Sequence, residues 1–421
     1  MRNQNRKRKH NSFDFNKNYL VVILISIIAI LVAIIGLKAR KTAQEKKHEA
    51  EVINSMYEAA MQIKSNDENA TVEPEKEEKK EDIVVSIVAV GDILCQKPIY
   101  EAAYSSKENK YNFYGIYSKI VDYVSKADIT VGTLETNFVN QNYSGGKKYN
   151  SPKEFAEVLK VIGLDVLNTA TNHSFDYGID GVKSTLDYLN SLELNTVGTQ
   201  KEETNEILIK DVKGIKIAFL SYTYGSSQKI DSSFAYCLNL MDKDKMKADI
   251  EKAKEEGADF VFVNMHWGDP SSNTPNEEQK ELADFLIQSG ADFVIGSHPT
   301  QIQPMEMKTK PDGSNGFVAY SLGAFTSTEN SKDSSIGMIL NIEVTKSGET
   351  DKCYLSNISY TPTYFMDRGK NAQNRFELID LDEAKDEIKK YDEGSQDKVS
   401  KAVYDKLKEA VIKMEKIIGN G

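Results

Sequence analysis

The stretch 168–178 constrains the fold of this chain more than any other. It follows a short apolar segment at 164–167, typical of a buried strand, and it precedes an amphipathic run at 181–192, typical of a helix. The polar pair Asn172-His173 therefore lies at the carboxyl end of a strand, where the loops of an open α/β sheet converge and ligands bind. An amide oxygen and an imidazole suit a metal ion or a phosphoryl oxygen, although an Asn-rich turn with a capping Asp gives the same local pattern.

Other apolar segments end in polar residues in the same way. Strands are expected at 84–90, 128–131, 214–222, 259–263 and 292–295. The polar side chains that follow four of these strands are Asp92, Glu135, His266 and His298. Helices are expected between the strands, at 242–256 and after the Pro-containing capping boxes at 151–154 and 274–277.

This alternation of strands and helices predicts a layered α/β domain of mixed sheets flanked by helices. From 316 to about 379 the pattern changes to strands without helices between them, which predicts a return sheet over the open edge. The domain is expected to occupy 83–380, and a helical tail to occupy 381–421. Within the tail, apolar residues spaced three or four apart predict an amphipathic helix that packs on the domain or on a partner; they are Val399, Val403, Leu407, Val411, Met414 and Ile418.

The amino-terminal part predicts a membrane anchor. Residues 19–37 carry no charge and are mostly Ile, Val and Leu, a length that approaches the ~30 Å of a bilayer core. The basic tail at 1–18 places the amino terminus in the cytoplasm and the remainder outside. An uncleaved anchor is favoured over a removed signal peptide, because no small-x-small cleavage site follows. The charged segment at 38–82 is typical of a stalk or linker.

Composition excludes several classes of function. The 421 residues carry a net charge of −11 although the first 18 residues are basic, so the outer part is not expected to bind nucleic acid. The three cysteines, Cys95, Cys237 and Cys353, are far apart and not in CxxC spacing. They indicate neither a disulfide framework nor a zinc knuckle.

The polar residues at the strand ends form a ligand set. Carboxylates, an amide oxygen and imidazoles from several strands suit one divalent Mn, Fe or Zn ion, and the expected ligands are Asp92, Glu135, Asn172, His266 and His298. A histidine that is not a ligand can protonate a leaving group, a role that fits His173, with Asp176 as the carboxylate that orients its ring. Core packing is the alternative for each histidine, above all for His266 beside Trp267.

Six ordered motifs carry a resemblance to a known family. They are Gly91-Asp92-Ile93-Leu94, Leu134-Glu135, Thr171-Asn172-His173, His266-Trp267-Gly268, Gly296-Ser297-His298-Pro299 and Tyr320-Ser321-Leu322-Gly323. In order and spacing these motifs resemble the CapA family, which is linked to poly-γ-glutamate capsule synthesis and export. The resemblance covers about 84–361 and implies a fold similar to calcineurin-like metallophosphoesterases. It also implies a single amino-terminal transmembrane helix.

The chain departs from the phosphoesterase pattern at two metal positions. Leu94 and Thr300 stand where that pattern has histidines. By the resemblance, the first metal position loses both imidazoles, while the second keeps Glu135, Asn172, His266 and His298. At most one tightly bound metal and weak or absent phosphoester hydrolysis are therefore expected. Lys97 stands where the family often has Arg, which implies contact with an anionic group.

Three functions follow from the resemblance. The first is a membrane-anchored, extracytoplasmic protein in the synthesis, export or anchoring of an anionic polymer such as poly-γ-glutamate, with other membrane subunits of a capsule synthesis complex as partners. The second is a metal-dependent phosphoesterase or hydrolase at the cell surface. The third is a non-catalytic polymer-binding or scaffold subunit with a degenerate metal site.

Overall fold

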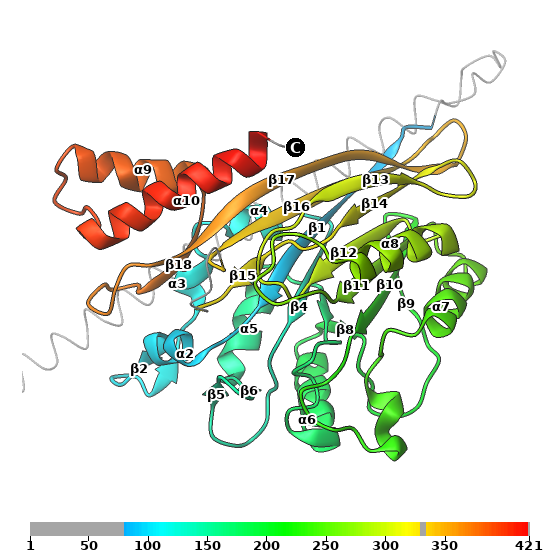
Figure 1. The fold of residues 1–421 in the computed structure, drawn as a ribbon, viewed down its shortest axis with the longest axis horizontal. Helices are drawn as coiled ribbons and strands as arrows, with labels where there is room; N and C mark the ends of the chain where they lie inside the picture. Colours follow the sequence, from blue (N-terminus) through cyan, green and yellow to red (C-terminus); the bar gives the residue numbers. More distant parts are fainter. Residues whose placement is uncertain (1–79, 329–333, 420–421) are drawn as a thin grey trace, which may run out of the picture. The chain divides into compact units, whose positions relative to one another are not determined.

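A computed structural model describes residues 80–328 and 334–419. Within them, two β-sheets stack face to face, with helices on the outer faces (Figure 1). The predicted layered α/β arrangement of mixed sheets flanked by helices is confirmed. No helix in these residues is long and apolar enough to cross a bilayer. The transmembrane helix predicted at 19–37 lies outside the described residues.

The first sheet has eight strands in the order β18-β17-β16-β1-β4-β7-β8, with β15 pairing separately with β1. A run of neighbouring parallel strands is formed by β1 (Ile83–Ile93), β4 (Ile129–Leu134), β7 (Val166–Asn168) and β8 (Asn195–Val197), and β15 also pairs parallel with β1. The others are β15 (Ala324–Thr326), β16 (Ile336–Lys346), β17 (Cys353–Asp367) and β18 (Phe376–Asp380). The predicted run of strands without helices between them is present, but β16 to β18 continue the first sheet antiparallel beside β1 and do not form a return sheet of their own.

The second sheet has six strands in the order β13-β14-β12-β11-β10-β9. Its parallel centre consists of β10 (Ile215–Thr223), β11 (Phe260–His266), β12 (Phe293–Ser297) and β14 (Asn315–Ala319). Antiparallel strands close both edges, β9 (Leu208–Val212) and β13 (Met305–Thr309). The central strands are buried on both faces, which explains why their sequences are continuous apolar runs without alternation.

Helices cover the outer faces of both sheets. On the first sheet they are α2 (Lys97–Ala103), α3 (Tyr114–Tyr117), α4 (Val121–Ser125), α5 (Lys153–Val161) and α6 (Gly178–Ser191), and on the second they are α7 (Lys243–Glu255) and α8 (Glu277–Ser289). The last two helices, α9 (Leu381–Asp392) and α10 (Lys401–Gly419), pack instead on the face of the first sheet that also contacts the second sheet. A 3₁₀ helix lies at Ser232–Cys237, and two small hairpins pair β2 (Tyr104–Ser105) with β3 (Lys110–Tyr111) and β5 (Ser144–Gly145) with β6 (Tyr149–Asn150).

The core between the sheets holds them together. Side chains of alternate residues on β1 and β4 meet those of β10, β11 and β12, including Ile87, Val131, Phe219, Phe262 and Ile295. Truncation of a buried aromatic such as Phe262 to Ala would cost about 3–5 kcal/mol, because it removes transfer free energy and leaves a cavity. Toward the carboxyl ends of the strands this inter-sheet layer becomes polar, and the candidate site begins there.

Both predicted capping boxes are wrong in detail. Ser151 does not cap α5; its hydroxyl lies 2.7 Å from the hydroxyl of Thr136, and Pro152 occupies the N-cap position. At α8 the capping box is formed by Asn276 and Gln279, two residues later than predicted. At α5 the Ser151 hydroxyl is engaged by a tertiary contact, and at α8 the nearby Asn276 side chain accepts from the backbone in place of Thr274.

The carboxyl-terminal helices pack on the domain. Five residues of the predicted apolar stripe are buried against β17 and β18, namely Val399, Val403, Leu407, Val411 and Met414. Arg368 in the turn after β17 also donates to Glu387 of α9 at 3.0 Å. Packing on the domain, one of the two expected alternatives for this stripe, is therefore the one observed.

Candidate metal centre

Four strands bring the predicted polar residues to one end of the two sheets. Asp92 lies near the end of β1, and Glu135 directly follows β4, the neighbouring parallel strand. His266 ends β11 in the opposite sheet, beside Ser297 at the end of β12. Because parallel strands end at the same edge, loops far apart in the sequence deliver these side chains to a common place.

Asp92, Glu135 and His266 form one buried group. One ligand atom from each of the three lies within 4.8 Å of the other two. The Nε2 atom of His266 is 3.8 Å from Oε2 of Glu135 and 2.8 Å from Oδ1 of Asn172. The structure thus places the amide oxygen predicted from the stretch 168–178 beside the imidazole and the carboxylates.

The surroundings keep His266 neutral. Burial lowers the pKa of His266 well below its usual range, and the nearby His298 and His173 rings lower it further. Its Nδ1 atom lies 3.0 Å from the hydroxyl of Ser297, which leaves Nε2 directed at Asn172 and Glu135. A neutral imidazole whose second nitrogen is held by a hydrogen bond is the form that binds metal ions.

The donor set fits one divalent cation. Two carboxylates, an imidazole and an amide oxygen are hard-to-borderline ligands that suit first-row transition metals. Asp92, Glu135, His266 and Asn172 are the residues that would hold it. At the two positions where the phosphoesterase pattern has histidines, this chain supplies no imidazole. Leu94 is buried, and the Thr300 hydroxyl donates to the carbonyl of Pro299 at 2.7 Å.

His298 contributes in a way that the sequence did not indicate. Its backbone N–H donates to both carboxylate oxygens of Asp92, at 3.1 Å each. Its ring lies 4.7 Å from the His266 ring and 4.8 Å from the Tyr224 ring, measured between centroids. His298 is not a member of the three-residue ligand group. Burial, together with a smaller effect of His173, lowers the pKa of His298 to about 4, while Asp269 opposes the shift.

His173 and Asp176 form a second pair at the mouth of the site. The Nδ1 atom of His173 is 2.9 Å from Oδ2 of Asp176. Asp176 is buried and also accepts hydrogen bonds from the Tyr149 N–H at 2.9 Å and the Ser227 hydroxyl at 2.5 Å. With 16% of its side chain exposed, His173 presents an oriented imidazole to the site entrance, an arrangement suited to proton transfer.

Lys97 lies apart from the buried group. It begins α2 with its side chain 64% exposed, and its ammonium group is 3.5 Å from Glu101 on the next turn. The anion-binding role of Lys97 therefore stays a prediction, as do the roles of the other site residues.

Several residues of the site were missed from the sequence. Tyr224 stacks near both His266 and His298, Ser297 supports His266, and Ser227 and Tyr149 hold Asp176. Tyr224 immediately follows β10, so the rule that polar residues follow each strand would have found it. Tyr149 lies in a short hairpin whose position depends on tertiary contacts, and no local pattern marks it.

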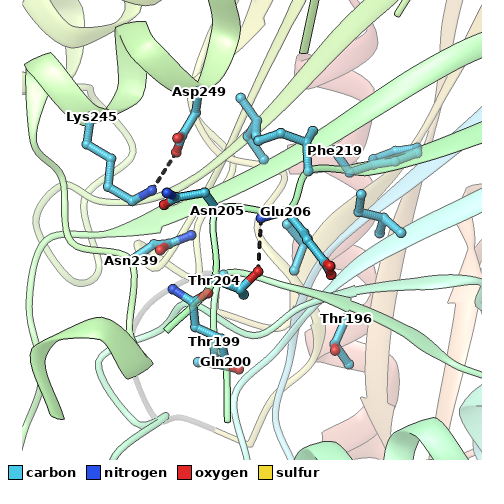
Figure 2. Close-up of a pocket in the computed structure, with 15 residues that line it drawn as sticks. Thr196, Thr199, Gln200, Thr204, Asn205, Glu206, Phe219, Asn239, Lys245 and Asp249 are labelled. Carbon is cyan, nitrogen blue, oxygen red and sulfur yellow. Dashed lines mark hydrogen bonds and ion pairs between the residues drawn. The ribbon is translucent and has the colours of Figure 1, made fainter. Parts of the chain in front are cut away.

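A separate pocket of about 270 Å³ opens between β8, β9 and α7 (Figure 2). Hydroxyl and amide groups line it, including those of Thr196, Gln200 and Asn239. Its lysine, Lys245, donates to Asp249 at 2.8 Å, as Figure 2 shows, so this charge is already compensated. No histidine and none of the predicted site residues line this pocket. Among the described residues, the group that could hold a metal ion lies at the strand ends.

Fold and site together define an α/β protein with a two-carboxylate, one-imidazole centre between two sheets. The chain belongs to the family described as bacterial capsule synthesis protein PGA_cap, whose model matches residues 86–329. It is 28% identical over 269 residues to the capsule biosynthesis protein CapA of Bacillus anthracis, covering 60% of this chain and 62% of that protein. It is 31% identical over 257 residues to the PGA biosynthesis protein CapA of Bacillus subtilis (strain 168), covering 58% and 63%. The chain thus spans less than two thirds of the length of these relatives.

Similarity to solved structures is weaker. The calcineurin-like phosphoesterase YfkN from Bacillus subtilis aligns with a TM-score of 0.38 and 14% identity, covering 67% of this chain and 90% of that chain. The NAD nucleotidase of Haemophilus influenzae aligns with a TM-score of 0.42 and 11% identity, covering 69% and 59%. Scores of this size carry no conclusion about activity.

Proposed function

We propose that this chain acts in the synthesis, export or anchoring of an anionic capsular polymer, poly-γ-glutamate, at the outer face of a membrane. The observation that carries the proposal is the buried Asp92–Glu135–His266 group in a member of a capsule synthesis family. A divalent Mn, Fe or Zn ion bound there would attract a carboxylate or phosphate group of the polymer or of a lipid carrier.

The chain's own residues prepare the site for a divalent cation. The Asp92 carboxylate is fixed by the His298 N–H, and His266 is fixed by Ser297 and Asn172. Preorganised ligands lose little conformational entropy when an ion binds, which favours a defined geometry. His173, held by Asp176, can give or accept a proton at the entrance without leaving its position.

The test is a replacement of Glu135 by Gln in the cells that make this protein. Loss of one carboxylate charge weakens cation binding while the side chain keeps its shape, so the cell-surface polymer is expected to fall to the level of a deletion strain. Asp211→Asn is the matched control. It also replaces a carboxylate by an amide, but Asp211 lies on the edge strand β9 of the second sheet and does not belong to the buried group. Normal polymer in the Glu135→Gln strain, with the protein present at wild-type level, would refute the proposal.

A second candidate is a metal-dependent phosphoesterase. The observation that favours it is the His173–Asp176 pair, which is arranged as a general acid or base with its orienting carboxylate. Turnover of simple phosphoesters that is lost in His173→Ala and reduced in Asp176→Asn would support this function. We expect weak or no turnover, because Leu94 and Thr300 do not supply the imidazoles of a two-metal centre.

A non-catalytic scaffold is the remaining alternative. It differs from the first two candidates in its dependence on the site: a scaffold that holds other membrane subunits near the synthase would keep its function in Glu135→Gln. The polymer assay on that variant therefore separates a scaffold from a protein whose site takes part.

The proposal includes a location. Residues 1–18 would be cytoplasmic, 19–37 would span the membrane, and 38–82 would hold the folded domain away from it. Protease added to cells stripped of their wall is then expected to digest the region after residue 82. Protection of that region until the membrane is dissolved would reverse the orientation.

A further inference from the structure

A small hairpin at the site entrance carries positive charge. Between Thr136 and Lys153 the sequence has three lysines and no acidic residue, although the whole chain has a net charge of −11. Two of these lysines, Lys147 and Lys148, lie in the turn between β5 and β6 and are exposed. This segment follows Glu135 of the buried group in the sequence.

Contacts from several elements hold the hairpin against the His173–Asp176 pair. The Tyr149 N–H donates to the Asp176 carboxylate, and the Tyr149 ring lies edge-on to the His173 ring with 4.5 Å between centroids. The Lys148 ammonium donates to the Asp176 carbonyl at 2.6 Å and lies 5.4 Å from the centre of the Tyr177 ring. The Ser144 hydroxyl is 2.7 Å from that of Tyr177. The turn is therefore positioned beside His173 by defined contacts.

The same hairpin contacts the start of α2. A Cβ atom added to Gly145 would lie 2.5 Å from the backbone nitrogen of Lys97, so the two backbones touch and only glycine fits there. This approach places the backbone of Lys97 next to the hairpin that carries Lys147 and Lys148. Lys97, Lys147 and Lys148 are called the lysine rim below.

The charges of the rim are only partly compensated. Lys147 makes no ion pair or hydrogen bond with its side chain in the described residues, and the Lys97 contact with Glu101 is long and exposed. Lys148 contacts a carbonyl and a ring, which orient its ammonium group but do not neutralise it. The carboxylate of Asp176, whose carbonyl accepts from Lys148, is buried and directed at His173, Tyr149 and Ser227.

We propose that the lysine rim binds successive carboxylates of a polyanionic chain and guides it past His173 into the site. This inference rests on the proposed function and names the residues that recognise its polymer. A chain with a carboxylate on every residue gains from several adjacent ammonium groups, whereas the rest of this acidic surface repels it. Asp269 contributes negative charge near His298, whereas Lys148 contributes positive charge beside Asp176, so the polyanion is favoured on the His173 side.

The test measures binding of a fluorescein-labelled γ-linked glutamate oligomer to the purified full-length chain, with chelator present so that bound metal does not contribute. The variants are K147Q/K148Q and the matched control K247Q/K352Q, which removes two exposed lysines of α7 and the β16–β17 turn. The rim variant is expected to weaken binding roughly fivefold, and the control to leave it unchanged within about twofold. A γ-linked glutamine oligomer is expected to bind no better to the wild type than to the rim variant.

Two further variants separate charge from hairpin folding. Within residues 80–328 and 334–419 the Lys147 side chain has no hydrogen-bond or ion-pair partner, so Lys147→Glu changes the charge without removing a contact there, and it should weaken binding at least as much as K147Q/K148Q. K148R keeps the charge and should bind like the wild type. If K147Q/K148Q and K147E bind the glutamate oligomer as tightly as the wild type does, the role of the lysine rim is refuted, while the proposed polymer stands. Failure of the wild type to bind the glutamate oligomer with chelator present would overturn the rim, and failure with added Mn²⁺ as well would also overturn the proposed polymer.

Discussion

The backbone N–H of His298 donates to both carboxylate oxygens of Asp92, although the two residues are 206 positions apart in the sequence. Asp92 belongs to the first sheet, and His298 follows the last residue of β12 in the second. A single carboxylate thus joins the two sheets at the point where the candidate metal centre lies. His298 has a φ angle of 95°, a conformation that side-chain-bearing residues rarely adopt.

The strain at His298 predicts an inverted order of stability for two substitutions. Both His298→Gly and His298→Ala remove the ring and keep the N–H that contacts Asp92. Glycine adopts φ of 95° without cost, so the Gly variant is expected to be about 1 kcal/mol more stable than the Ala variant, the reverse of the usual order. Denaturant unfolding of both variants measures the difference. A more stable Ala variant would show that the backbone at residue 298 does not need this conformation.

The ligand set predicts at most one tightly held metal ion. After dialysis, elemental analysis of the purified protein is expected to find about one equivalent of Mn, Fe or Zn. Glu135→Gln and His266→Ala should each reduce this metal content at least tenfold, because each removes a ligand from the buried group. Asp269→Asn is the control, since Asp269 is outside that group. Two equivalents after dialysis would restore a dinuclear centre.

The observed capping box predicts different effects for two neighbouring substitutions. Asn276→Ala should destabilise the protein by about 1 kcal/mol, because the Asn276 side chain accepts from the Gln279 N–H at the start of α8. Thr274→Ala should have almost no effect, since its hydroxyl contacts only the exposed Asn273. Thermal or denaturant unfolding would compare the two. An equal loss in both variants would contradict the cap at Asn276.

The contacts of Glu387 predict a pH-dependent loss of stability. Burial alone would raise the pKa of Glu387, but hydrogen bonds from Arg368 and Lys390 outweigh it and hold the pKa below its ordinary value of 4.5. A carboxyl whose pKa is lower in the folded state stabilises the protein above its unfolded pKa. This contribution is therefore present above pH 4.5 and is lost as the pH falls through the lower folded value.

Glu387→Gln should remove that part of the acid dependence and cost about 1–3 kcal/mol near neutral pH, because Arg368 loses a buried partner. The measurement is the free energy of unfolding as a function of pH. Glu393→Gln, an exposed change at the end of α9, should keep the wild-type slope. An unchanged slope in Glu387→Gln would show that other carboxyl groups cause the acid dependence.

Much of the candidate site could be predicted because its residues follow strands. Asp92, Glu135 and His266 each come at or directly after an apolar run, so Asp92 and Glu135 lie at the carboxyl edge of the parallel strands of the first sheet and His266 at that of the second. The supporting residues could not be found in this way. Tyr149 and Lys148 reach the site through a two-stranded hairpin that has no apolar run of its own.

The sequence by itself determined three features: the alternation of strands and helices, the strand-end positions of the site residues and the amphipathic stripe of the last helix. These features depend only on periodicity and on the order of residues along the chain. Only the tertiary structure decided that β16 to β18 extend the first sheet, that the caps of α5 and α8 differ from the local motifs, and that His298 contacts Asp92 through its backbone. These features depend on which distant groups compete for the same hydrogen-bond donors and sheet edges, and that competition is settled only when the two sheets pack together.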